Sequence, residues 1–129
     1  MTPWVLIVED DRELRQFYRT LFESNGFRID QAHNGHQAFE KAIDSRYDLI
    51  LTDIAVPGID GIELCRRLRA DERTRLIPVI AVTGYADRRY PDRAMEAGAD
   101  HVIIKPCAGP TLLAEARRLI KRSAERIAG

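Results

Sequence analysis

Four short, largely apolar runs, rich in β-branched residues, constrain the fold of this chain more than any other feature of its sequence. They occupy residues 5–8, 49–52, 79–82 and 102–104, and stretches long enough for amphipathic helices separate them. Uninterrupted runs of this kind are typical of strands in a parallel sheet that is covered on both faces. The sequence therefore predicts an α/β fold in which strands and helices alternate.

Each of these runs is followed or closed by a residue that can carry chemistry. In chain order these residues are Glu9, Asp10, Asp11, Asp53, Thr83 and Lys105. In a parallel sheet all strands end at the same edge, which is where open α/β folds place their sites. Carboxylates gathered there repel one another by about 4 kcal/mol per pair at about 4 Å and an effective dielectric of about 20. They are tolerable together if they hold a cation.

Composition narrows the class of protein. The 129 residues suit a single domain spanning residues 1–129, and 20 basic residues balance 20 acidic ones. This balance gives no support to direct binding of nucleic acid or of a membrane surface. No apolar stretch approaches the ~20 residues that span a bilayer, and Cys65 and Cys107 have no metal or redox spacing. We therefore expect a cytoplasmic protein with two reduced thiols.

Hydrophobic periodicity and turn residues predict five strands that alternate with five helices. The strands are expected at 4–8, 27–31, 49–53, 79–83 and 102–104, and the helices at 12–24, after Asn34-Gly35, after Gly61, at 91–97 and at 110–128. Asp11 falls where a helix N-cap belongs, and Asp60 with Gly61 serves a turn into the third helix. Pro91 fits only a first helical turn, so the fourth helix is expected to be short and to follow a long loop.

Four motifs stand in a fixed order along the chain: Val8-Glu9-Asp10-Asp11, the segment 53–61, Thr83-Gly84 and Lys105-Pro106. Together they resemble the motif set of two-component response regulator receiver domains, and the resemblance covers nearly the whole chain. It implies a doubly wound, flavodoxin-like fold. Its five parallel strands would have the order 2-1-3-4-5, with helices on both faces of the sheet, as in chemotaxis regulators.

The resemblance also implies a magnesium site. Asp10 would bind the ion directly and Glu9 through water, while Asp53 and the backbone carbonyl of Ala55 would supply further oxygens. Mg²⁺ keeps several waters, so a few protein ligands suffice. Alignment from Gly26 backwards places the family's acidic pair on Glu9 and Asp10. Asp11 is then left to cap the first helix and to support the ligands from outside the coordination sphere.

The remaining motif residues would serve phosphoryl transfer, which asks a protein mainly for positioning and charge neutralisation. Asp53 would be the nucleophile that becomes an aspartyl phosphate. Lys105 would pair first with Asp53 and then with a phosphoryl oxygen, and the Thr83 hydroxyl would donate to another oxygen. The family also implies a cis peptide bond between Lys105 and Pro106, which would aim the lysine inward.

The chain departs from the family pattern at two positions. Val102 stands where the family relays phosphorylation through an aromatic ring that turns inward toward Thr83, and a β-branched side chain is stiff. Tyr85 and the short fourth helix are expected to carry the change instead, with its effects concentrated in residues 84–90. Cys107 replaces a phenylalanine and is expected to thin the packing under the last helix.

The leading functional hypothesis is a phospho-accepting receiver in a two-component phosphorelay. It would take a phosphoryl group from a histidine kinase or a histidine phosphotransfer protein, catalysing only its own phosphorylation and dephosphorylation. The conformational change would alter binding of a protein target through the fourth helix, the fifth strand and the fifth helix. A phosphorylation-dependent homodimer is one possibility.

Other functions remain open at this point. The chain could be a stand-alone regulator, with Met1 and the Lys- and Arg-rich last helix slightly favouring this, or a receiver from a larger regulator or hybrid kinase. An Asp-nucleophile phosphohydrolase would require a second aspartate where Ala55 stands. A flavin carrier would place a phosphate loop after the first strand, where Glu9, Asp10 and Asp11 would repel the phosphate.

Overall fold

Five parallel strands form one sheet in the computed structural model, which describes residues 2–84 and 89–128, with side chains as far as residue 126. The strands are β1 (Trp4–Val8), β2 (Arg28–Ala32), β3 (Leu49–Asp53), β4 (Val79–Thr83) and β5 (His101–Ile104). Their order is β2-β1-β3-β4-β5, and every neighbouring pair is parallel. The predicted strand order is confirmed.

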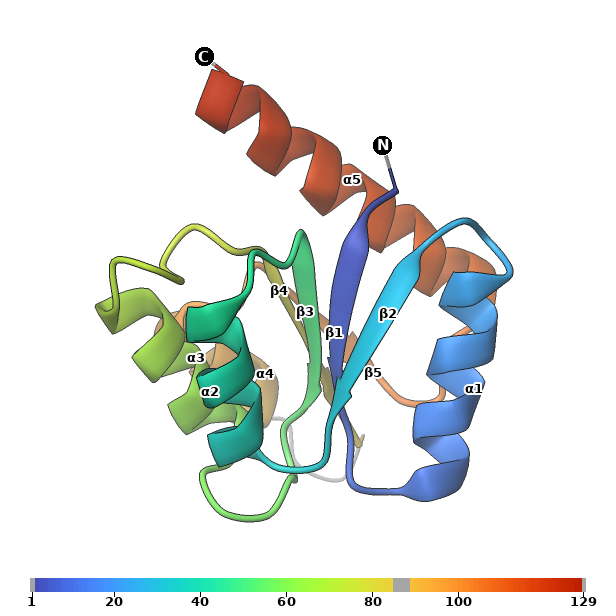
Figure 1. Ribbon diagram of the computed structural model, residues 1–129. Helices are drawn as coiled ribbons and strands as arrows, with labels where there is room; N and C mark the ends of the chain where they lie inside the picture. Colours follow the sequence, from blue (N-terminus) through green and yellow to red (C-terminus); the bar gives the residue numbers. More distant parts are fainter. Residues whose placement is uncertain (1, 85–88, 129) are drawn as a thin grey trace.

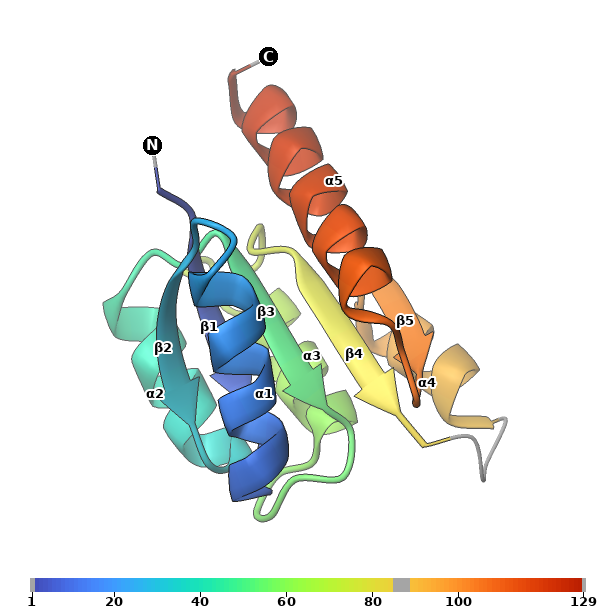
Figure 2. The same cartoon turned by 90° about the vertical axis from the view of Figure 1, so that its right-hand side faces the viewer.

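Helices cover both faces of the sheet. They are α1 (Arg12–Glu23), α2 (Gly35–Asp44), α3 (Gly61–Ala70), α4 (Arg89–Ala97) and α5 (Gly109–Ala128). Figure 1 shows α2, α3 and α4 on one side of the sheet, and Figure 2 shows α1 and α5 on the other. In both views the described part of the chain begins and ends at the same end of the molecule, where the strands begin, and α5 extends past the sheet there.

The apolar runs are explained by this double coverage. Along β1, Leu6 and Val8 pack in the core layer under α2, α3 and α4, whereas Val5 and Ile7 pack in the layer under α1 and α5. All four side chains are at most 1% exposed. Because both faces of the strand are buried, its residues are apolar throughout and do not alternate between polar and apolar.

Three helices begin at polar caps, each of which accepts a hydrogen bond from a backbone N–H two or three residues later. Asp11 caps α1, Asn34 caps α2 and Asp60 caps α3. Such caps satisfy N–H groups that have no partner within the helix. The capping role predicted for Asp11 and the turn predicted at Asp60 are both confirmed.

Several element boundaries differ from the predicted ones by one or two residues. α1 ends at Glu23 rather than at residue 24, β2 ends at Ala32 rather than at residue 31, and β5 begins at His101 rather than at residue 102. β2 begins one residue later than predicted, because Phe27 donates its N–H to the Phe22 carbonyl (3.1 Å) and stacks edge-on against that ring. α4 begins at Arg89 rather than Pro91, so the proline still lies in the first turn, where a missing N–H is harmless. α5 begins at Gly109, one residue before Pro110.

The structure describes only part of the region that was expected to relay phosphorylation, which comprises Val102, Tyr85 and α4. Val102 packs partly buried against the core layer under α2, α3 and α4, and the ring of Tyr90 from α4 joins the same layer. Tyr85 lies outside the described residues, so its role stays a prediction. Cys107 contacts the layer under α1 and α5.

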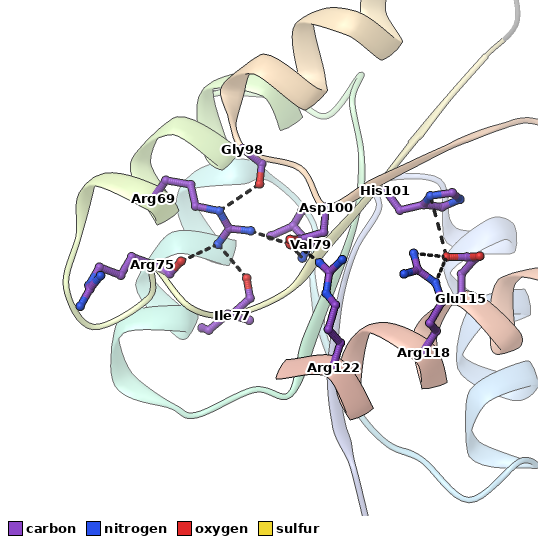
Figure 3. Close-up of polar contacts among 10 residues, drawn as sticks. All are labelled: Arg69, Arg75, Ile77, Val79, Gly98, Asp100, His101, Glu115, Arg118 and Arg122. Atoms are coloured by element: carbon purple, nitrogen blue, oxygen red, sulfur yellow. Dashed lines mark hydrogen bonds and ion pairs between the residues drawn. The ribbon is translucent and has the colours of Figure 1, made fainter. Parts of the chain in front are cut away.

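Polar contacts brace the edge of the sheet where the strands begin (Figure 3). Asp100, just before β5, accepts from Arg69 of α3 (2.8 Å), from the N–H of Val79 (2.8 Å) and from Arg122 of α5 (3.2 Å). Arg69 also donates to the carbonyl of Gly98 (2.9 Å). The two helices α3 and α5, which lie on opposite faces of the sheet, are thereby joined through one carboxylate.

Two exposed arginines of α5 form ion pairs. Arg118 pairs with Glu115 on the same helix (2.8 Å), and Arg122 pairs with Asp100 (3.2 Å). Among the described residues, no helix is both long enough and apolar enough to cross a membrane.

Gly61 lets α3 approach the end of β3 closely. Its N–H donates to the Ile54 carbonyl (2.8 Å), and a Cβ at this position would lie 2.6 Å from the Asp53 carbonyl oxygen and 2.8 Å from Ile54 Cα. Both neighbours are backbone atoms and cannot rotate away. A residue with a side chain at position 61 therefore displaces the segment that carries Asp53.

We expect Gly61→Ala to lower the free energy of unfolding by about 1–3 kcal/mol, because the added methyl group overpacks rigid backbone. Urea denaturation measures this loss. Gly84→Ala is the matched control, since a Cβ at Gly84 would meet nothing within 4 Å. Equal stability of the two variants would contradict the close approach at Gly61.

Candidate functional site

The parallel sheet brings four of the predicted residues to one edge. Glu9 directly follows β1, Asp53 ends β3, Thr83 ends β4 and Lys105 directly follows β5. The Lys105 N–H donates to the Thr83 carbonyl (2.8 Å), which continues the pairing of β4 with β5 as far as the site. Residues separated by up to about a hundred positions are therefore neighbours because their strands end together.

Asp53 is the centre of the group. Its side chain is buried, Oδ1 accepts from the N–H of Ala55 (2.9 Å), and Oδ2 is in contact with the ammonium group of Lys105. The peptide bond between Lys105 and Pro106 is cis, as the resemblance implied. Burial lowers the pKa of Lys105, but the hydrogen bond and charge of Asp53 outweigh it and hold that pKa above its usual value.

Glu9 is buried beside this pair. Its Oε2 accepts from the N–H of Asp11 (3.1 Å), whereas Oε1 has no hydrogen-bond partner among the described residues and lies 3.9 Å from Lys105 Nζ. Burial, together with the neighbouring carboxylate of Asp53, raises the pKa of Glu9 to about 7. A buried carboxylate oxygen without a hydrogen-bond partner is unfavourable, so an additional positive charge beside it would stabilise the site.

The other predicted residues are less closely gathered. Asp10 and Ala55 are exposed at the rim of the edge, and Asp11 is exposed at the start of α1. Thr83 is buried, and its hydroxyl donates to the carbonyl of Gly84 (3.2 Å). The structure thus brings Glu9, Asp53 and Lys105 into direct proximity and leaves Asp10 outside that contact.

The residues present fit a magnesium ion, although the described part of the chain contains no group of three His, Cys, Asp or Glu side chains close enough to hold one. In this arrangement Lys105 provides the positive charge between the carboxylates, and Asp10 faces solvent. The unpartnered Oε1 of Glu9 is a ready oxygen ligand. Mg²⁺ binds through one or two carboxylates and retains waters, so a preformed cage is not required.

Sequence reasoning missed one residue that shapes the site. Arg15 of α1 donates from its guanidinium to backbone carbonyls of the loop that carries Glu9 and Asp10. Nothing in the sequence distinguishes this arginine from the others on the amphipathic helix, and charged helix residues ordinarily face solvent. Only the capping position of Asp11, four residues earlier, indicates that Arg15 lies one turn above the loop.

Comparison with known families gives the decisive observation. The model for the response regulator receiver domain matches residues 5–117. The chain belongs to this family. Receiver domains of this kind are modules of two-component signalling, and the fold described above is theirs.

Individual relatives of this receiver domain include proteins named as transcriptional regulators. It is 34% identical to the transcriptional regulatory protein ResD of Bacillus subtilis over 94% of the chain, and 33% identical to the phosphate regulon transcriptional regulatory protein PhoB of Rhizobium meliloti over 95%. The alignments cover 49% and 54% of those proteins. The chain thus spans about half the length of the curated relatives it matches.

Two of the solved structures of similar receiver domains come from histidine kinases. One, from a signal transduction histidine kinase of Syntrophus aciditrophicus, is 35% identical with a TM-score of 0.88 and covers 93% of this chain and 91% of its own. Another, from sensor histidine kinase PA1611 of Pseudomonas aeruginosa, is 30% identical with a TM-score of 0.87 and covers 94% and 99%. That second domain holds a magnesium ion coordinated in its active site cleft.

The raised pKa of Glu9 predicts how stability depends on pH without metal. Because the pKa of Glu9 in the folded protein is about 7 and its ordinary value is 4.5, Glu9 stabilises the fold below about pH 4.5, and this contribution is lost as pH rises through 7. In EDTA at pH 8, Glu9→Gln should therefore unfold at a higher temperature than the wild-type protein, because its free energy of unfolding is higher by on the order of 1 kcal/mol. The advantage should shrink toward pH 5.

Thermal melts across this pH range, with the exposed Glu40→Gln of α2 as control, measure the effect. A Glu9→Gln variant no more stable than the wild type at pH 8 would show that the buried charge is already compensated.

Proposed function

We propose that Asp53 accepts a phosphoryl group and that the modified protein then binds its target differently. The observation that carries this proposal is the contact of the Lys105 ammonium with Asp53 next to the unpartnered buried oxygen of Glu9. The carboxylate of Asp53 is held in place as a nucleophile. The ammonium group of Lys105 supplies positive charge to it, and the buried carboxylate of Glu9 beside it would be stabilised by further positive charge. This is the arrangement that phosphoryl transfer requires of a protein.

In the reaction, a carboxylate oxygen of Asp53 forms a bond to phosphorus as the bond from phosphorus to the donor nitrogen or oxygen breaks. The donor keeps the electron pair of that bond. Lys105 moves its charge from the carboxylate to a phosphoryl oxygen, and the Thr83 hydroxyl, which donates to the Gly84 carbonyl in this structure, turns to another. The Ala55 N–H holds Asp53 Oδ1 during attack.

Magnesium would be held by Glu9, Asp10, Asp53 and the carbonyl of Ala55. When bound, the ion supplies neutralisation of the charge that accumulates on the phosphoryl oxygens. Support for this comes from the free oxygen of Glu9 and from the magnesium ion in the cleft of the PA1611 receiver domain. The same chemistry lets the protein catalyse only its own phosphorylation and dephosphorylation, not turnover of an external substrate.

The donor would be a phosphohistidine on a histidine kinase or a histidine phosphotransfer protein. We propose that residues 1–129 act as one receiver domain, either by themselves or within a regulator or hybrid kinase, since similar domains occur in both settings. Cys65 and Cys107 are free thiols, which suits the reducing cytoplasm.

The target would bind to the surface formed by α4, β5 and α5. Met95 of α4 is 48% exposed and Ile104 of β5 is 50% exposed, so two large apolar side chains lie open there. β5 leads directly to Lys105, so movement of this lysine toward a phosphoryl group acts on the same surface. A homodimer that forms on phosphorylation would use this surface as well.

Asp53→Asn should abolish phosphorylation, because an amide is not a useful nucleophile. Mass spectrometry after treatment with acetyl phosphate and Mg²⁺ detects the adduct. Asp60→Asn is the matched control, since Asp60 caps α3 in the same segment but takes no part in the transfer. A full-strength adduct on Asp53→Asn would overturn the assignment of the nucleophile.

Magnesium affinity should depend on Asp10 more than on Asp11. Asp10→Ala removes a direct ligand, whereas Asp11→Ala removes the α1 cap and costs about 1 kcal/mol of stability. Titration calorimetry measures the affinity and urea denaturation the stability. Greater loss of magnesium binding in Asp11→Ala than in Asp10→Ala would mean that the acidic pair is assigned one residue out of register.

A further inference from the structure

Arg15 connects helix α1 to the acidic loop and to the edge strand β2. Its Nη1 donates to the carbonyl oxygens of Glu9 (3.0 Å) and Asp10 (3.4 Å), and its Nε donates to Oε1 of Gln31 (3.0 Å). The side chain is only partly exposed. One guanidinium therefore spans two consecutive peptide groups of the loop, and Gln31 fixes its plane.

These bonds complete a closed ring of contacts around the loop. The Asp11 N–H donates to Oε2 of Glu9 (3.1 Å), and the Arg15 N–H donates to the Asp11 carbonyl (2.9 Å). Arg15 then returns to the carbonyls of Glu9 and Asp10 through its side chain. The direction of the Glu9 carboxylate, and with it the placement of the free Oε1, is set by this ring.

We propose that Arg15 is a positioning residue that sets the magnesium affinity of the site by holding the backbone that carries Glu9 and Asp10. This inference rests on the proposed function, because it concerns the ion that phosphoryl transfer uses. Arg15 contacts the loop through peptide carbonyls, and the structure gives it no contact with the carboxylates of Glu9 or Asp53. It acts on the ion only through the ligands that it orients.

The charge and the geometry of Arg15 would change magnesium affinity in opposite directions. A guanidinium that never loses its proton repels a dication, so removing it would tighten binding if charge dominated. Loss of the hydrogen bonds frees the loop and would weaken binding if position dominated, and groups that orient metal ligands typically change affinity about 10–100-fold. The carbonyl contacts lead us to expect that position dominates.

Two substitutions separate these effects. Arg15→Lys keeps the charge but cannot reach the loop carbonyls and Gln31 together, whereas Arg15→Met removes both the charge and the donors. Arg19→Met is the matched control, because Arg19 lies one turn further along α1 and, within the described part of the chain, pairs only with the exposed Glu23 (2.8 Å). Circular dichroism and thermal melting establish that each variant is folded.

The experiment measures magnesium binding by titration calorimetry and the initial rate of acetyl phosphate labelling as a function of magnesium concentration. We expect the dissociation constant and the half-saturating concentration to rise about tenfold in Arg15→Met and less in Arg15→Lys. The rate at saturating magnesium should reach the wild-type value in both. Arg19→Met should titrate like the wild type.

Three results would overturn the inference. Tighter magnesium binding in Arg15→Met would show that charge dominates, and titrations of both Arg15 variants identical to the wild type would show that the arginine only supports the fold. A maximal rate that falls while the half-saturating concentration stays unchanged would place Arg15 in the transfer step itself. If the wild-type protein shows no magnesium-dependent labelling at all, the proposed function fails first and this inference with it.

Discussion

The ion pair between Lys105 and Asp53 is the interaction on which the character of the site depends. The sheet forces Asp53 and Glu9 to the same edge, where two carboxylates in a partly buried setting repel each other by several kcal/mol. One ammonium group compensates Asp53 by direct contact and reaches Glu9 only at 3.9 Å. The edge therefore forms although Oε1 of Glu9 has no hydrogen-bond partner among the described residues. The proposed binding of a cation and of a phosphoryl group depends on this buried oxygen.

The order of the strands is sufficient to bring these residues together. β1 and β3 are neighbours, as are β3 and β4 and then β4 and β5, so the residues after these strands fall side by side. The flanking helices then fix each connection locally, Asp11 at the start of α1 and Asp60 at the start of α3. Gly61 brings α3 against the Asp53 backbone, so Asp53, the proposed nucleophile, is supported both by the sheet and by a helix.

Much of the fold could be predicted from the sequence because strands, helix starts and caps depend on local residue types. A buried strand needs a continuous apolar run, and a helix start needs an acceptor, so the ends of β1 and β3 and the cap at Asp11 follow directly from residue types. The order of the strands could not be obtained in this way and came from the resemblance of the motifs. The start of α4 was placed two residues late, because Pro91 permits two positions in the first turn and the sequence does not choose between them.

The sequence could not predict which side chains contact groups far away along the chain. Arg15 and Arg69 are two arginines on amphipathic helices, and their sequence surroundings do not show that one holds a loop and the other a carboxylate 31 positions away. The same holds for the different burial of the adjacent acids Glu9 and Asp10, which depends on how the loop leaves the sheet. Such contacts depend on three-dimensional packing of flexible side chains rather than on propensity.

The described part of the chain begins and ends where the strands begin, opposite the edge that carries Asp53 (Figure 1). Asp100 braces this end by joining α3 to α5. A polypeptide attached to either terminus would thus lie beside this braced end and leave the edge that carries Asp53 open to the proposed phosphoryl donor. Longer proteins can therefore carry such a domain through either terminus with no change to the edge that carries Asp53. Regulators about twice the length of this chain contain similar sequences.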